Sequence, residues 1–174
     1  MENLLRQRGF HEGKVRRLRA VLEHHRPFAG TRPSLFGRIL SIADDYDILT
    51  ASFPGHPGLP PPVAQGAMWA ARGKTYDPDL LAAFVQVMGA YPPGSLLELS
   101  DGRWAVVTSG GRDRERFVWP RVRIVREADG REAPGKEQED LFERRQELRP
   151  KRVLNPVTIG VEIGPLVERA FANP

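Results

Sequence analysis

The sequence of 174 residues contains no cysteine. Disulfides and thiolate metal sites are therefore excluded, and any metal ion would be held by histidine, aspartate or glutamate. Long apolar runs and internal repeats are also absent, so we expect a cytoplasmic location and no membrane partner. A chain of this length is typical of one domain, or of one domain with a small appendage.

The charge balance is positive, with 26 lysine and arginine residues against 22 aspartate and glutamate residues. The two signs are interleaved along the chain, and a tight basic group occurs at Arg16, Arg17 and Arg19. No nucleic-acid-binding motif accompanies this group, so we interpret it as a solvated helix face. A nucleic-acid partner is not expected.

Apolar residues in the first half recur at helical spacing. Proline-rich loops separate the helices, the longest of them being FPGHPGLPPP. Ser34 and Asp77 stand where N-cap residues are preferred. The predicted helices are Gly13 to His25, 35–52, Pro62 to Gly73 and Pro78 to Met88.

From Ser95 the apolar spacing changes to two, as in strands. The segments SLLELS and RWAVVT flank Asp101-Gly102, which predicts a hairpin, and RVRIVRE predicts a third strand. We expect this sheet to pack on the helix Pro78 to Met88. The residues expected at that contact are Leu97, Leu99, Val106 and Ile124.

The remaining sequence has weaker patterns. Residues 135–150 are highly charged and predict a frayed helix or a solvated linker, and the last twenty residues predict one short strand and one short helix. The fold class predicted from these patterns is mainly α. A partial helical bundle would occupy residues 1–94, and a small antiparallel β-sheet extension with a charged linker and short C-terminal elements would occupy residues 95–174.

The apolar segment RILSIADDYDILTAS contains an aspartate in an unusual place. Asp44 lies opposite the main apolar stripe of this helix, but its neighbours one turn away are Leu40 and Ile48. A helix that is apolar on two sides is usually packed on two sides, so we expect Asp44 to be partly buried. A retained buried carboxylate needs a hydrogen-bond donor, a cationic side chain or a metal ion.

A second group of candidate ligands precedes this helix. His24 and His25 lie at the end of the first predicted helix, and a short loop makes the two helices neighbours. Consecutive residues on a helix diverge by about a hundred degrees, so the two histidines would address two adjacent metal ions better than one.

The order HH, RILSIADDYDILTAS, YDPDLLAAF and YPPGSLLELSDGRWAVV resembles the C-terminal part of an HD-GYP domain, from about Val21 to about Val125. The resemblance implies an HD-type helical bundle around two or three iron or manganese ions that hydrolyse cyclic di-GMP. It also implies that His24, His25 and Asp44 are metal ligands and that Asp47 is a neighbouring supporting or capping group.

The sequence departs from this family in ways that affect function. The His-Asp pair and the other histidine ligands of the family precede the matching region and are not present here. Arg26 follows the tandem histidines where the family has an acidic residue, and Phe53, Pro54 and Gly55 replace its basic substrate-binding residues. The sequence therefore indicates a truncated, degenerate HD-GYP-like domain.

Two interpretations of function remain open. We favour a non-catalytic signalling, regulatory or interaction module without a cofactor, in which His24 or His25 forms a hydrogen bond with Asp44. Its partners would be a second copy or another signalling domain. The alternative is a fragment or subunit of a metal-dependent cyclic di-GMP phosphodiesterase, whose iron or manganese site is completed by an upstream segment or a partner chain.

Overall fold

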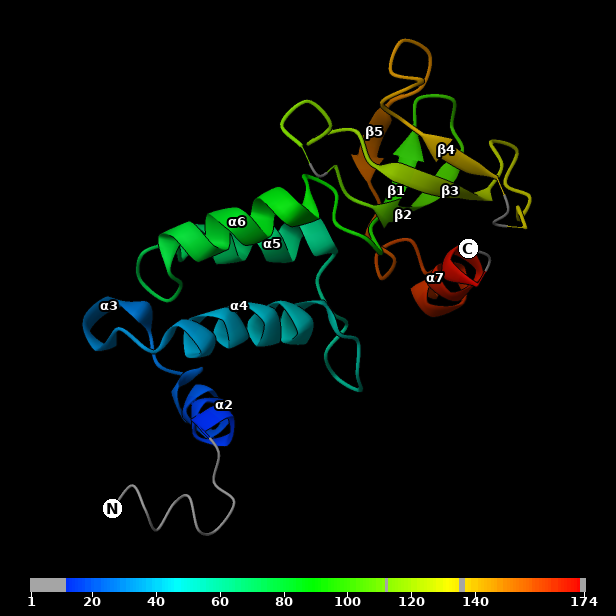
Figure 1. Cartoon of the computed structure of the whole chain (residues 1–174). Coiled ribbons are helices and arrows are strands. Elements are labelled where there is room, and N and C mark those ends of the chain that lie inside the picture. The colour runs from blue at the N-terminus through cyan, green and yellow to red at the C-terminus, as the bar shows by residue number, and fades with distance from the viewer. Residues whose placement is uncertain (1–11, 112, 135–136, 173–174) are drawn as a thin grey trace, which may run out of the picture.

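The computed structural model describes residues 12–111, 113–134 and 137–172 (Figure 1). The helical elements come first and the strands follow, with one further helix at the end. In chain order they are α2 (Glu12–Glu23), α3 (Phe28–Thr31), α4 (Leu35–Thr50), α5 (Pro61–Ala70), α6 (Pro78–Met88), β1 (Leu96–Leu99), β2 (Trp104–Ser109), β3 (Arg121–Arg126), β4 (Gln138–Asp140), β5 (Pro150–Val153) and α7 (Ile163–Phe171).

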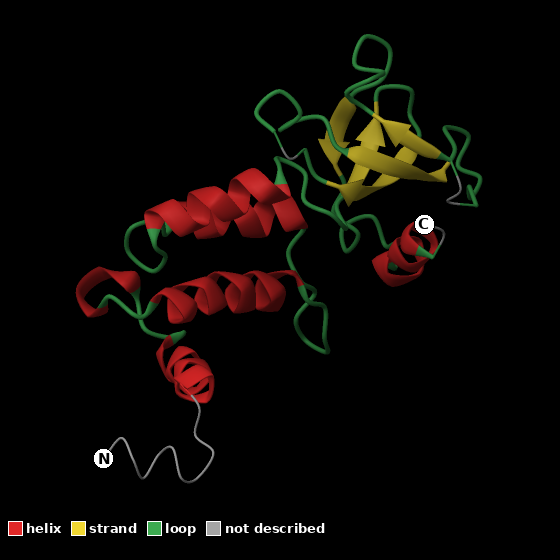
Figure 2. Ribbon diagram, in the orientation of Figure 1, coloured by secondary structure: helices red, strands yellow, loops and turns green. Residues whose placement is uncertain are grey.

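Helix α4 is the centre of the helical part. It contacts α2 on one side and α5 and α6 on the other, as Figure 2 shows. The prediction that this helix is packed on two sides is therefore confirmed. The side of α4 that faces α5 and α6 contributes to an apolar core. The fully or nearly buried members of this core are Ile42, Met68, Tyr76 and Leu81.

Both predicted N-caps are confirmed. The hydroxyl of Ser34 accepts a hydrogen bond from the Gly37 N–H at 3.3 Å. The carboxylate of Asp77 accepts from the backbone N–H groups of Asp79 and Leu80, at 3.0 and 3.1 Å. These bonds satisfy backbone donors that have no partner inside the helix.

Asp77 also connects two helices. Its carboxylate accepts a hydrogen bond from the Arg38 guanidinium of α4, and it is 6% exposed. Burial alone would raise the pKa of Asp77, but hydrogen bonds from the Leu80 N–H and from Arg38 outweigh it, so the pKa lies below its usual value. Asp77 therefore fixes the start of α6 against α4.

We expect Asp77→Ala to destabilise the protein by about 2–4 kcal/mol. The change removes an N-cap and leaves the Arg38 cation without its partner in a half-buried place. Urea denaturation measures the effect. Asp79→Ala, an exposed change in the same turn, is the control and should cost less than about 1 kcal/mol. Equal losses in the two variants would contradict the role of Asp77.

The strands form one antiparallel sheet in the order β4-β3-β2-β1-β5. The predicted hairpin between β1 and β2 is confirmed. Gly102 has a φ of 88°, which a residue with a side chain rarely adopts, and Leu97 pairs with Ala105 across the hairpin. The β1–β2 register places Leu97 and Leu99 on one face of the sheet and Leu96 on the other.

Each face of the sheet has its own apolar core, and the packing predicted from sequence is wrong. One face packs against Leu141 and Leu148, and the other packs against Leu166 and Ala170 of α7. Neither core includes a described residue of α6. The residues that were expected to meet α6 divide between the two faces. They are Leu97, Leu99 and Ile124 on the first face and Val106 on the second.

The charged segment 135–150 is neither a helix nor a solvated linker in its described part. It supplies strand β4 and the buried Leu141 and Leu148. Ion pairs make this possible, because Asp140 lies 3.0 Å from both Arg116 and Arg121, and Glu139 is paired with Arg144. The charge of Asp140 is thus paired with arginines from β3 and from the loop before it, and that of Glu139 with an arginine of the same segment.

The predicted mainly α fold class is therefore wrong. The described chain is 39% helix and 18% strand, and its five-stranded antiparallel sheet makes it a mixed α and β protein rather than a helical bundle with a small extension. The error has a local cause. Strands β4 and β5 are three and four residues long and mostly polar, so they lack the alternation by which a strand is recognised.

We expect a fragment of residues 90–174 to unfold in one cooperative thermal transition, because both faces of its sheet are covered by its own segments. Circular dichroism and calorimetry measure this. Leu166→Ala should destabilise the fragment by about 2–5 kcal/mol, whereas the exposed Val157→Ala should have little effect. Aggregation of the fragment, or the absence of a transition, would show that the sheet depends on the helical part.

In the part of the chain that the structure describes, no helix combines the length and apolar character that a membrane crossing requires.

Candidate metal centre

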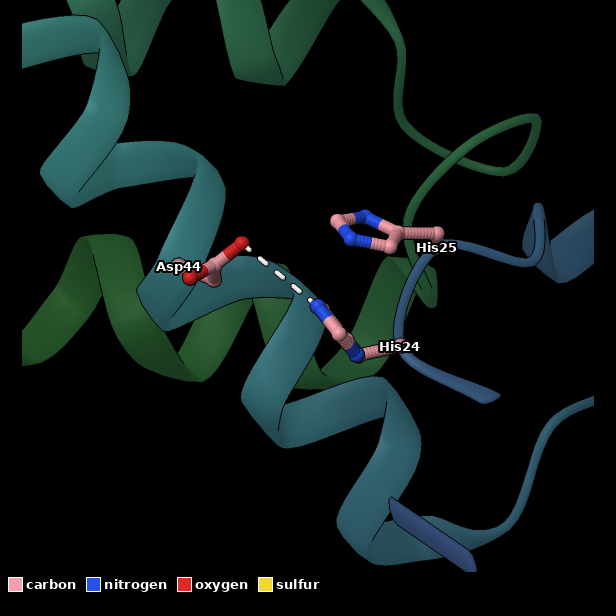
Figure 3. Close-up of side chains that lie close together, drawn as sticks. All are labelled: His24, His25 and Asp44. Carbon is pink, nitrogen blue, oxygen red and sulfur yellow. Dashed lines mark ion pairs between the residues drawn. The ribbon is translucent and has the colours of Figure 1, made fainter. Parts of the chain in front are cut away.

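His24, His25 and Asp44 lie together at the junction of α2 and α4 (Figure 3). The two histidines come directly after the last residue of α2, and Asp44 is in the middle of α4. Each side chain offers one ligand atom, and the three atoms lie within 4.8 Å of one another. In residues 12–111, 113–134 and 137–172, this is the only group of three or more such residues close enough to hold a metal ion.

Glu23 and Gly37 bring the two helices together at this point. Glu23 is 9% exposed, and its carboxylate accepts hydrogen bonds from the Ser34 N–H and the Arg19 guanidinium, both at 2.8 Å. A Cβ atom at Gly37 would lie 3.1 Å from the Cβ of Glu23, so the close approach favours glycine here. Gly37 and Asp44 are seven residues apart and share one side of α4. His24, which follows Glu23, consequently lies beside Asp44.

The α2 helix ends two residues earlier than predicted, and this changes the geometry of the histidines. His24 and His25 lie in a turn rather than on the helix, so the divergence of about a hundred degrees does not apply to them. Their rings are 3.7 Å apart between centroids, with an interplanar angle of 41°. Both imidazoles therefore lie at one place, which suits a shared ion better than two separate ones.

His24 is oriented by the backbone. Its Nδ1 lies 2.7 Å from the Val21 carbonyl oxygen, and because a carbonyl can only accept, Nδ1 carries the proton. In neutral His24 the Nε2 lone pair is then free, and Nε2 lies 3.7 Å from Asp44 Oδ2. Metal-binding histidines commonly donate their second ring N–H to a carbonyl or carboxylate.

The sequence favoured a hydrogen bond from His24 or His25 to Asp44, and neither bond is formed among the described residues. A separation of 3.7 Å exceeds hydrogen-bond range, although it allows an ion pair when His24 is protonated. The side chains of His24 and Asp44 are 15% and 36% exposed, and His25 is exposed. Asp44 is thus partly buried, as predicted, and the cluster opens toward solvent.

Two imidazole nitrogens and one carboxylate oxygen can hold one borderline or hard divalent cation such as manganese, iron or zinc. A small inward movement of the side chains would be needed, because metal–ligand distances are about 2.0–2.2 Å. A two-metal clamp on a phosphate needs additional ligands, and no further described His, Asp or Glu belongs to this cluster. The arrangement is therefore a candidate site for one cation, open to solvent at His25.

Asp47 does not belong to the cluster. Its side chain is exposed on the next turn of α4, and its backbone carbonyl accepts the hydrogen bond that ends the helix, from the Ala51 N–H at 2.8 Å. Its role as a supporting group remains a prediction. Sequence reasoning missed Glu23 and Gly37, although a glycine inside a helical pattern often marks a close packing contact.

His24, His25 and Asp44 are therefore candidate ligands for a metal ion, and their donor types are those of histidine-carboxylate metal sites. Over 113 residues the chain is 33% identical to a cyclic di-GMP phosphodiesterase from Pseudomonas aeruginosa. The match covers 59% of this chain and 26% of that protein, so the chain spans about a quarter of the length of its relative. The similarity agrees with the HD-GYP-like resemblance. No protein-family model matches the chain, and neither does any solved structure.

The Glu23 carboxylate predicts a pH dependence of stability. Hydrogen bonds from Arg19 and Ser34 lower the pKa of Glu23 from 4.5 to about 2. The ionised form is therefore favoured in the folded state, and its contribution is present above about pH 4.5 and is lost as the pH falls toward 2. We expect Glu23→Gln to reduce the loss of stability between about pH 6 and pH 3.

Urea denaturation at the two pH values measures this difference. Glu12→Gln is the matched control, because Glu12 is exposed on the same helix and also pairs with an arginine, Arg16. The control should keep the pH dependence of the unchanged protein. If Glu23→Gln keeps it as well, then Glu23 does not carry the effect.

Proposed function

We propose that the chain is a signalling or interaction module related to metal-dependent cyclic di-GMP phosphodiesterases, and that it does not hydrolyse the dinucleotide by itself. The observation that carries this proposal is the donor count at His24, His25 and Asp44, which suits one cation. Hydrolysis by a two-metal site requires ligands that clamp both ions beside the phosphate. Another signalling domain would be the partner of such a module.

The cleft beside the C-terminal end of α4 gives no support for binding a cyclic dinucleotide. It has a volume of about 610 Å³ and lies between the C-terminal end of α4 and the segment before α7. Its lining includes Thr50, Leu96 and Val167, and Glu162 is its one charged residue. No lysine or arginine lines this cleft, all of whose lining residues are described, whereas phosphate recognition usually relies on such cations. None of the three candidate ligands, His24, His25 and Asp44, lines this cleft.

An active phosphodiesterase subunit is the second candidate function. Two observations favour it: the oriented Nε2 of His24, and the opening of the cluster toward solvent at His25. Ligands from another segment could approach from that side. If a cation is bound there, it would supply Lewis acidity and an activated water. His24, His25 and Asp44 would hold it, and the Val21 carbonyl would keep the His24 ring in place.

We expect the purified chain to release no linear product from cyclic di-GMP in the presence of manganese or iron(II). We also expect it to bind at most one manganese ion, with binding weakened at least tenfold in Asp44→Asn and His25→Ala. Chromatography of the reaction and isothermal titration with manganese measure these results. Turnover that Asp44→Asn abolishes would contradict the proposal and establish the active-subunit alternative.

A further inference from the structure

Helix α2 presents its apolar side away from the rest of the molecule. Val15, Leu18 and Leu22 are 44%, 53% and 75% exposed, and we call them the outward stripe. Ala20, by contrast, is 6% exposed. Because Leu18 and Leu22 are each two positions from Ala20, they lie about 160° around the helix from it. The side of α2 that contacts α4 is therefore small and polar, with Ala20 and Glu23 as its buried residues.

The outward stripe has no partner among the described elements. In Figure 1 α2 lies at the outer edge of the helical part, beside α4. Amphipathic helices normally bury the apolar side and expose the polar side. The inverse arrangement in α2 indicates that the stripe packs on something outside the described chain.

The spacing of the stripe identifies the kind of surface that would cover it. Val15, Leu18 and Leu22 are separated by three and four residues, which is the spacing of the a and d positions of a heptad. Ala20 then stands at f, the position farthest from the seam. A second helix docked along α2 could therefore pack against this narrow row of a and d residues. The helix contains no aromatic residue, which membrane-surface helices commonly carry on their apolar side.

Charge decides which helix would dock. On this assignment the flanking e and g positions hold Lys14, Arg19 and the apolar Val21, so both charged residues among them are cationic. The Arg19 side chain is 64% exposed although its Nε bonds to Glu23. In a parallel pair of two α2 helices, Lys14 of one copy would face Arg19 of the other, and the like charges would repel. A second copy of the chain is therefore disfavoured.

We propose that the outward stripe of α2 is a docking site for an acidic amphipathic helix of a partner protein. The partner would place leucine-like side chains against Val15, Leu18 and Leu22, and glutamate or aspartate beside Lys14 and Arg19. This interaction surface is separate from the cation site and does not depend on metal binding or hydrolysis.

The test uses two labelled peptides of about three heptads, with leucine at a and d and either glutamate or lysine at e and g. Fluorescence anisotropy measures their binding to the full chain. We expect the acidic peptide to bind at least tenfold more tightly than the basic one. Leu18→Glu and Leu22→Glu should each weaken it at least tenfold, and Lys14→Glu should reduce the preference between the peptides.

Val157→Glu is the matched control, since Val157 is 56% exposed and lies outside α2. It adds the same charge and should leave peptide binding unchanged. The mutated stripe residues are exposed, and thermal melting verifies that each variant is folded.

Four results would overturn the proposal. They are absence of binding by the acidic peptide, equal binding of both peptides, formation of a dimer in light scattering that Leu22→Glu dissociates, and binding to phosphatidylglycerol vesicles that Leu22→Glu abolishes. The third result would assign the stripe to a second copy, and the fourth would assign it to a membrane surface.

Discussion

The contact between Glu23 and the start of α4 determines how the first half of the molecule is arranged. One buried carboxylate joins α2 to the Ser34 N–H, while Gly37 leaves room for its Cβ. A carboxylate that accepts two charge-assisted or backbone hydrogen bonds can be buried without neutralising. The same contact brings His24 beside Asp44 and turns the apolar side of α2 outward. The candidate metal centre and the exposed stripe are thus two consequences of one polar contact.

Paired charge has an equivalent role in the second half. Asp140 and Glu139 form ion pairs with arginines from β3 and from nearby loops, which allows a strongly charged segment to join the sheet. Such pairs add little net stability when exposed, but breaking a partly buried pair leaves an uncompensated charge. Apolar packing from Leu141 and Leu148 supplies the driving force, and the ion pairs determine where the segment can lie.

Short-range sequence patterns were sufficient to predict most of the helical part and the candidate site residues. Apolar spacing and the caps Ser34 and Asp77 identified the helices, because capping and amphipathicity act within a few residues. The end of α2 was placed two residues too late, and element boundaries are commonly uncertain by that amount. Because α2 ends at Glu23, His24 and His25 lie in one turn instead of at diverging helical positions, and there they could share a cation.

By itself, the sequence predicted the helices other than α3, the β1–β2 hairpin and the candidate ligands His24, His25 and Asp44, because each depends on residue chemistry or short-range periodicity. Only the tertiary structure decided that short polar strands complete a five-stranded sheet, that its two faces have separate cores, and that α2 is turned outward. These features depend on pairing between residues far apart in the chain. Hydrogen bonds and ion pairs of that kind leave no periodic signal in the sequence.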